Sequence, residues 1–228
     1  MQEKKEFNIE DCIYDKSRIC PICENEFKSR EIKKGKTRFV ELDLGLRSIY
    51  APIVPDYYNV IMCGECGYSA IEKRFNNLTL TNIKKVRNKR NTNYVPPKYP
   101  AIYDIEIAID RFKKALYFCY MKESDLSERA YICNKLANLY SDLKDEKLEL
   151  EYRTHAYNWY KEAYINEKFP IMDMEEEQLL YTIAYLAYKI GKKDEAKKIL
   201  GELIIKKTIS YILKEKIQEF IEILKEEN

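Results

Sequence analysis

Apolar residues recur at alternating steps of three and four through most of the second half of the chain. This spacing places them on one face of a helix. The first stripe comprises Ile102, Ile105, Ile109, Phe112, Leu116 and Cys119. The same periodicity predicts further helices over 127–143, 146–168, 174–190, 193–206 and 209–225. We therefore expect a helical second half, with Cys119 and Cys133 on its apolar stripes as core residues.

Polar residues and one glycine mark the ends of these predicted helices. Gly191 is expected to end the helix over 174–190 because glycine favours the position after a helix. Side chains suited to capping stand at the predicted starts: Asp125 or Ser127, Asp145, Asp173 and Asp194.

Small residues within the helices follow the spacing of tetratricopeptide repeats, which use them where paired helices touch. The segment 180–200 carries Ala184, Gly191 and Ala196 at the repeat's positions. The interval from Ala137 to Ala184 is 47 residues instead of about 34, so the repeats are degenerate. An ordinary helical bundle is the alternative.

The first half differs in composition and predicted structure, because it contains most of the prolines and its pattern predicts β-strands. Residues 26–42 are predicted to form a hairpin around Gly35, and 57–62 a strand. The proline-rich segment 91–100 disfavours helix and is interpreted as a linker or an extended crossing segment. We expect a small β module with its linker over 1–100 and a tetratricopeptide-like helical domain over 101–228, in a mainly α fold.

Charge and composition add limits on the class of protein. Residues 1–100 carry a net charge of +6 and residues 101–228 a net charge of −4, which suggests two units with different surfaces. An apolar content of 46% with 13% aromatic residues favours a globular chain. No apolar run reaches the roughly 20 residues of a membrane span, and the N-terminus lacks a signal peptide. A cytoplasmic location, where thiols stay reduced, is therefore expected.

Four of the seven cysteines form two Cys-x-x-Cys pairs: Cys20, Cys23, Cys63 and Cys66. Two such pairs complete a tetrahedron of thiolates around one metal ion. We predict one structural zinc ion per chain in a zinc-ribbon-like module, since a four-cysteine site leaves no position open for catalytic water. Iron, which uses the same ligands, is the alternative metal. Cys12 is interpreted as a packed residue, with a free thiol or a substitute ligand as alternatives.

The residues around the two pairs resemble a known bacterial family. The pattern includes Cys20-Pro21-x-Cys23-x3-Phe27 and, around the second pair, Tyr57-Tyr58-x-Val60-x2-Cys63-x2-Cys66-Gly67-Tyr68-x-Ala70. It is similar to the family named domain of unknown function 2225. The resemblance implies a cysteine-rich N-terminal part followed by tetratricopeptide-like helices, and it implies no established activity.

No motif in the sequence points to catalysis. The chain has no phosphate-cradling glycine loop, no His-Glu-x-x-His and no glycine-flanked serine elbow. We therefore expect a non-enzymatic scaffold whose helical domain binds a peptide or protein. The expected contact residues lie on the first helices of the predicted pairs: Tyr131, Asn134, Asn138, Tyr181 and Tyr185. The alternative is that these tyrosines simply complete the core.

A basic run provides the alternative function of nucleic-acid binding. Within 84–98, cations are followed by Tyr94, an arrangement that single-strand binders use for phosphates and bases. The competing interpretation is a solvated helix end, because cations favour the last turn of a helix. The candidate contacts are Lys84, Lys85, Arg87, Lys89 and Arg90.

Overall fold

The computed structural model describes residues 8–206 and 208–227 and divides the chain into two compact units. Unit 1 comprises Met1–Glu41 and Ile49–Glu123, and unit 2 comprises Leu42–Ser48 and Ser124–Asn228. The predicted boundary near residue 100 differs from this division in two ways. The first long helix belongs with the cysteines, and a short segment from the N-terminal half belongs with the later helices.

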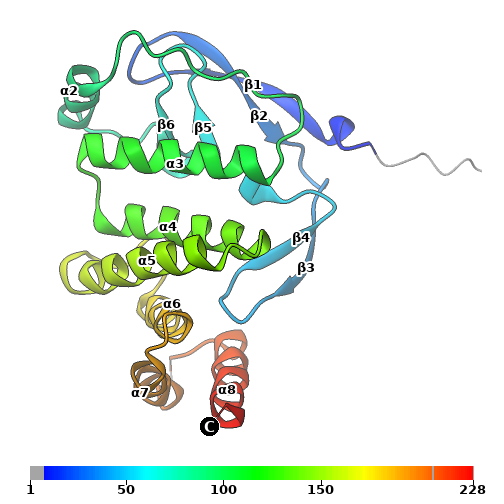
Figure 1. Ribbon diagram of the computed structural model, residues 1–228, viewed down its shortest axis with the longest axis vertical. Helices are drawn as coiled ribbons and strands as arrows, with labels where there is room; N and C mark the ends of the chain where they lie inside the picture. The colour runs from blue at the N-terminus through cyan, green and yellow to red at the C-terminus, as the bar shows by residue number, and fades with distance from the viewer. Residues whose placement is uncertain (1–7, 207, 228) are drawn as a thin grey trace, which may run out of the picture. The chain divides into compact units, whose positions relative to one another are not determined.

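The strands of the N-terminal half form three two-stranded sheets (Figure 1). β1 (Ile13–Ile19) pairs antiparallel with β2 (Glu26–Ile32), and β5 (Val60–Met62) pairs antiparallel with β6 (Ser69–Ile71). β3 (Arg38–Leu42) pairs with β4 (Ser48–Ala51). The predicted hairpin over 26–42 is therefore wrong, because β2 pairs with the strand before it.

β1 escapes a hydrophobic-pattern prediction because most of its side chains are exposed. Polar contacts join it to β2 instead: the Tyr14 hydroxyl donates to Glu31 over 2.8 Å, and Lys16 pairs with the same carboxylate over 3.2 Å. Arg18 also pairs with Glu31. Cross-strand pairs of this kind stabilise a sheet without apolar alternation.

Three helices complete unit 1: α1 (Glu72–Phe75), α2 (Leu80–Lys89) and α3 (Ile105–Lys122). α2 begins at a reciprocal cap between Thr79 and Asn82, and Asp104 caps α3 by accepting from the Ile107 amide over 2.9 Å. α3 packs on β5, β6 and α2. The helix predicted from the first apolar stripe is therefore a wall of the cysteine-containing unit.

The segment 91–104 is an extended crossing segment within unit 1. Arg30 donates to the Ala101 carbonyl over 2.7 Å, and the Tyr103 amide donates to the Tyr58 hydroxyl over 3.1 Å. The rings of Tyr58 and Tyr103 stack with their centroids 4.8 Å apart. These contacts bind the segment to its own unit, so it does not act as an interdomain linker.

Unit 2 is built from consecutive packed helices, and the apolar periodicity predicts each of these helices. α4 packs against α5, α6 against α5 and α7, and α7 against α8. Each helix lies within a few residues of its predicted range. The bounds are α4 (Leu126–Asp142), α5 (Glu146–Asn166), α6 (Glu176–Lys189), α7 (Lys193–Ile204) and α8 (Tyr211–Glu226).

The expected caps hold in part. Asp145 accepts from the Leu148 amide over 3.0 Å at the start of α5, and Gly191 follows α6 with a φ of +83°. α6 instead begins after Glu175, which forms a reciprocal cap with Gln178, and α7 begins after Lys192. The predicted caps for these two helices are therefore each two residues away from the observed ones.

The tip of the β3–β4 hairpin, Leu42–Ser48, packs inside unit 2. The buried Tyr181 hydroxyl on α6 donates to the Leu44 carbonyl over 2.7 Å. Leu44 and Leu46 pack on the apolar cluster formed by α6, α7 and α8. Arg47 makes a two-pronged contact with Asp142, with nitrogen–oxygen distances of 2.9 and 2.6 Å. The tip is therefore an irregular segment fixed by apolar, hydrogen-bond and ionic contacts.

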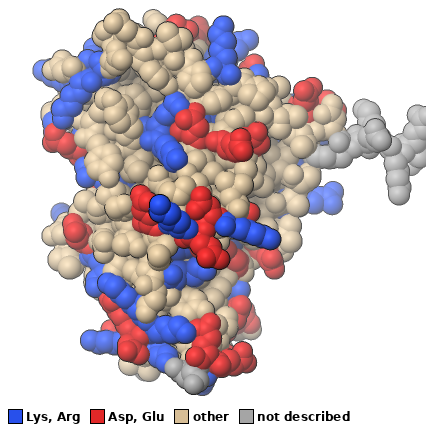
Figure 2. Space-filling view, in the orientation of Figure 1, with Lys and Arg blue, Asp and Glu red and all other residues tan. Residues whose placement is uncertain are grey.

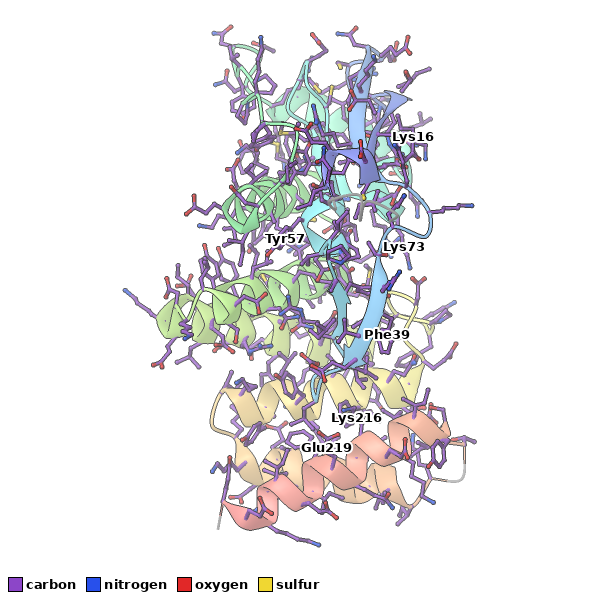
Figure 3. All side chains as sticks on the ribbon, turned by 90° about the vertical axis from the view of Figure 1, so that its right-hand side faces the viewer. Lys16, Phe39, Tyr57, Lys73, Lys216 and Glu219 are labelled. Carbon is purple, nitrogen blue, oxygen red and sulfur yellow. The ribbon has the colours of Figure 1, made fainter. Side chains whose placement is uncertain are left out.

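The surface carries closely mixed charges. Blue and red side chains are interspersed on the face shown in Figure 2. On α8, for example, Lys216 and Glu219 form a pair at 2.8 Å (Figure 3). Among the helices of residues 8–206 and 208–227, none combines the length and apolar character that crossing a bilayer requires.

Candidate metal centre

The first Cys-x-x-Cys pair forms the turn of the β1–β2 hairpin. The Cys20 amide donates to the Asn25 carbonyl over 3.0 Å, and the Glu24 amide donates to the Cys20 carbonyl over 2.9 Å. The Ile22 amide points at the Cys20 Sγ, 3.4 Å away. These bonds curl the backbone so that both cysteines of the pair face the same side.

The second pair repeats this pattern in the turn of the β5–β6 hairpin. The Cys63 amide donates to the Tyr68 carbonyl over 2.9 Å, and the Gly67 amide donates to the Cys63 carbonyl over 3.0 Å. The Glu65 amide lies 3.4 Å from the Cys63 Sγ. We call each of these two cysteine-containing turns a knuckle. In both knuckles the backbone hydrogen bonds and N–H···S contacts join the first cysteine to the residues two, four and five positions after it.

Both knuckles need a left-handed residue four positions after the first cysteine. In the second knuckle this residue is Gly67, with a φ of +74°, where a Cβ would also stand 2.4 Å from the Tyr94 ring. In the first knuckle it is Glu24, with a φ of +65°. Glycine tolerates this conformation freely, whereas glutamate adopts it at a cost.

The two knuckles bring the four predicted cysteines together. Their sulfur atoms all lie within 4.8 Å of one another. Cys20 Sγ is 3.6 Å from Cys66 Sγ, and Cys23 Sγ is 3.7 Å from Cys63 Sγ. A tetrahedron with metal–sulfur bonds of about 2.3 Å has edges of about 3.8 Å, so this spacing fits one four-thiolate ion.

The cluster is part of the apolar core of unit 1. Cys20 and Cys63 are fully buried, Cys66 is buried and Cys23 is half-buried. Hydrogen bonds from Cys20, then from Cys66, lower the pKa of the Cys63 thiol, while burial opposes that shift. Apolar residues from all parts of the unit surround the sulfurs: Ile22, Phe27, Ile61, Tyr68, Ala70, Phe75, Val86, Phe118 and Met121.

The basic run lies on α2 and at its end, and part of it holds the first knuckle. Arg87 Nε donates to the Ile22 carbonyl over 2.6 Å, and its guanidinium pairs with Glu24 over 2.6 Å. Lys85 and Lys89 both pair with Glu123. Three of the five predicted nucleic-acid contacts thus have acidic partners within unit 1. Lys84 is exposed and Arg90 half-buried.

The three remaining cysteines lie outside the cluster. Cys12 is buried beside Ile53, Tyr58 and Tyr103, and its Sγ lies 3.6 Å from the Asn8 carbonyl. Its interpretation as a packed residue agrees with this position. Cys119 and Cys133 are buried on α3 and α4, as their place on apolar stripes predicts.

The predicted partner-contact residues of α6 are used inside unit 2. Tyr181 is fully buried, and its ring packs edge-on to Phe220. Tyr185 is half-buried, and a Cβ on Gly45 of the hairpin tip would stand 2.7 Å from its ring. Burial raises the pKa of the Tyr185 hydroxyl. These positions correct the expectation of an open groove here, because the chain's own tip covers the rings.

The predicted contacts on α4 are less enclosed. Tyr131 and Asn134 are half-buried, and Asn138 is buried. The Asn134 side-chain oxygen accepts from Arg153, whose guanidinium also lies over the Tyr185 ring. Lys135 approaches the Tyr131 ring at 5.5 Å. Of the five residues, Tyr131 and Asn134 therefore remain the accessible candidates.

Comparison with known proteins places the chain in a family. No curated protein and no solved structure gives a significant match to the chain. A family model described as "Uncharacterized protein conserved in bacteria (DUF2225)" matches residues 13–225, which include both knuckles and the helices of unit 2. The chain therefore belongs to this bacterial family.

Proposed function

We propose that the protein is a non-enzymatic cytoplasmic adaptor in which one zinc ion stabilises unit 1 and the helices of unit 2 bind a segment of a protein partner. The observation that supports the binding role is that the hairpin tip packs on α6 and α8. The observation that supports the metal is the convergence of four thiols at tetrahedral spacing.

The metal has a structural role in this proposal. Four thiolates fill the coordination sphere of zinc and leave no position for a reacting water. Backbone N–H groups of Ile22 and Glu65 point at two of the sulfurs and would stabilise their negative charge. Iron would occupy the same ligands, but it gives a visible absorption band. Elemental analysis and an absorption spectrum of protein purified without chelator distinguish the two metals.

The hairpin tip illustrates the chemistry that unit 2 offers to a partner. The tip is held by a main-chain hydrogen bond from Tyr181, by two leucine side chains and by an Arg–Asp pair. Peptides bound in protein grooves use the same combination of main-chain bonds and side-chain anchors. We place the partner on the face of α4 that carries Tyr131 and Asn134, because α4 also receives the tip at Asp142.

Site-specific crosslinking tests this placement. A photoreactive phenylalanine replaces Tyr131 in the full chain, and the matched control replaces Tyr211, which is 74% exposed on α8. We expect one protein adduct in nuclease-treated lysate of the source bacterium from position 131 and none from position 211. The purified partner should then bind at least tenfold more weakly to a Tyr131→Ala, Asn134→Ala variant. No adduct, or the same adducts from both positions, would overturn the proposed surface.

A further inference from the structure

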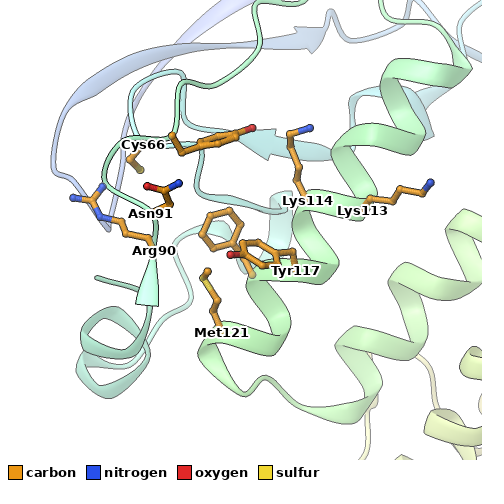
Figure 4. A pocket seen from close by; sticks show the side chains of 10 residues that line it. Cys66, Arg90, Asn91, Lys113, Lys114, Tyr117 and Met121 are labelled. Atoms are coloured by element: carbon orange, nitrogen blue, oxygen red, sulfur yellow. The ribbon is translucent and has the colours of Figure 1, made fainter. Parts of the chain in front are cut away.

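A cavity of about 410 Å³ opens within unit 1 beside the cysteine cluster (Figure 4). Cys66 and Gly67 of the second knuckle form one side, with Arg90 and Asn91 from the end of α2. Residues of α3 form another side, including Tyr117 and Met121. Its volume falls within the range of roughly 300–1,000 Å³ that small-molecule sites occupy.

Aromatic and thioether side chains give the cavity an apolar interior. Phe118 and Met121 are buried in the core around the cysteines, whereas Tyr117 is 55% and Tyr94 37% exposed. Tyr94 is fixed by close contact with Gly67, where no side chain intervenes. Aromatic side chains of this kind stack against the face of a planar ring, and many different rings can make this contact.

Three cations line the same cavity: Arg90, Lys113 and Lys114. Lys114 is neutralised by Asp110. The Arg90 Nε is buried, and no hydrogen-bond partner for it lies within residues 8–206 and 208–227. The guanidinium fork of this half-buried side chain suits a phosphate or carboxylate.

We propose that this cavity binds a small ligand that combines a planar aromatic ring with an anionic group. The ring stacks among Tyr94, Tyr117 and Met121, and the anionic group binds Arg90. Asn91 offers an amide donor and acceptor for polar atoms on the ring. This site is separate from the proposed partner surface on α4 and does not depend on it.

Calorimetric titration of the full chain, with its metal as purified, tests the site. Adenosine 5′-monophosphate and indole-3-acetate carry the two kinds of anion, while adenosine and ribose 5-phosphate each lack one half of the required chemistry. We expect at least one anionic aromatic probe to bind with a sub-millimolar Kd, and adenosine and ribose 5-phosphate to bind at least tenfold more weakly. No binding of either anionic aromatic probe would overturn the proposal.

Variants assign the binding to this cavity. Arg90→Gln should weaken binding of the anionic probe at least tenfold, whereas Lys84→Gln, which removes one charge from α2 outside the cavity, should leave its Kd within twofold. Met121→Trp should block the cavity, and Tyr117→Ala, at an exposed ring, should weaken binding about tenfold without unfolding risk. Binding that is unchanged by Arg90→Gln or by Tyr117→Ala would show that the site is elsewhere.

Discussion

The two units of this chain are stabilised in different ways. In unit 1, the core assembles around the sulfurs of Cys20, Cys63 and Cys66, and the strands form only isolated pairs. Two-stranded sheets have marginal stability by themselves. In unit 2, paired helices bury a continuous apolar cluster that includes Tyr181, Leu200 and Phe220. One short chain thus combines a core built around a cysteine cluster with a core formed by apolar packing between helices.

Loss of the metal should have the largest effect and should separate the two units. Cys63→Ser removes one of the four thiolates, and structural zinc contributes about 10–16 kcal/mol of apparent free energy in small peptides. We expect the variant to lose its metal and the amide protection of α3 and the β5–β6 hairpin, while α4 to α7 stay protected. Elemental analysis and hydrogen exchange with mass spectrometry measure both.

Cys12→Ser provides the matched control, since this buried cysteine lies outside the cluster. It should keep one metal ion per chain. Equal loss of protection in both units after metal removal would show that the fold of unit 2 also depends on the metal.

The second effect belongs to unit 2. Tyr181→Ala removes a fully buried ring and its bond to the hairpin tip, which should cost about 3–5 kcal/mol of unfolding free energy. Tyr181→Phe keeps the ring and leaves the Leu44 carbonyl without its donor, at a cost of about 1 kcal/mol. Urea unfolding followed by circular dichroism gives both values.

Tyr211→Ala serves as the control for this pair, because its ring is 74% exposed. It should change the unfolding free energy by less than about 0.5 kcal/mol. If Tyr181→Ala unfolds at the wild-type urea concentration, the ring is not part of the core and the predicted open groove would have to be reconsidered.

A smaller effect should link the basic run to the first knuckle. Arg87→Ala removes the donor to the Ile22 carbonyl and the partner of Glu24. We expect about 1–2 kcal/mol less stability in unit 1 and faster metal transfer to a chelator. Lys84→Ala, on the same helix and exposed, should leave the transfer rate unchanged.

Nucleic-acid binding would give the opposite result for this helix. Unchanged metal transfer in Arg87→Ala, together with weaker and salt-dependent binding of single-stranded DNA by both variants, would establish a phosphate-binding surface. Fluorescence anisotropy at low and high salt measures that binding.

The smallest expected effect is a loss of stability in unit 2 at acid pH. Burial alone would raise the pKa of Glu149, but Arg153 and Lys189 hold it below its usual value. Stability from a lowered carboxyl pKa is present above the unfolded value of about 4.3 and is lost as the pH falls through the folded value. We therefore expect unit 2 to lose about 1 kcal/mol or less below about pH 5. Glu149→Gln should remove this loss, as hydrogen exchange across α5 and α6 at pH 6 and pH 3.5 would measure.

Local signals in the sequence predict the helices of unit 2 and the four cysteines. A helical stripe such as that of α6 repeats over several turns, and paired Cys-x-x-Cys motifs specify ligands by spacing alone. β1 gives no such signal, since polar partners across the strand pair replace apolar alternation. Each knuckle is the turn of a hairpin, so the position of β1 directly before the first knuckle was the signal that could have identified it as a strand.

Long-range contacts explain the other differences. The apolar stripe of α3 predicts a helix, but it does not say that Phe118 and Met121 pack beside cysteines about 50 residues earlier. The bond between Tyr181 and Leu44 joins residues 137 positions apart. A tyrosine that contacts a partner and a tyrosine covered by the chain's own loop look alike in a sequence, so the pattern alone did not separate these two interpretations of Tyr181 and Tyr185.

The hairpin tip also has a consequence for biosynthesis. The ribosome makes Leu44 and Leu46 well before α6 and α8, the helices that cover them. During translation these two leucine side chains therefore remain exposed to water, or bound by a chaperone, until more than a hundred further residues have been synthesised. A nascent chain stalled after α5 would present the cysteine-containing module with an uncovered leucine-bearing loop. Such a chain would expose apolar surface even after its four cysteines had come together.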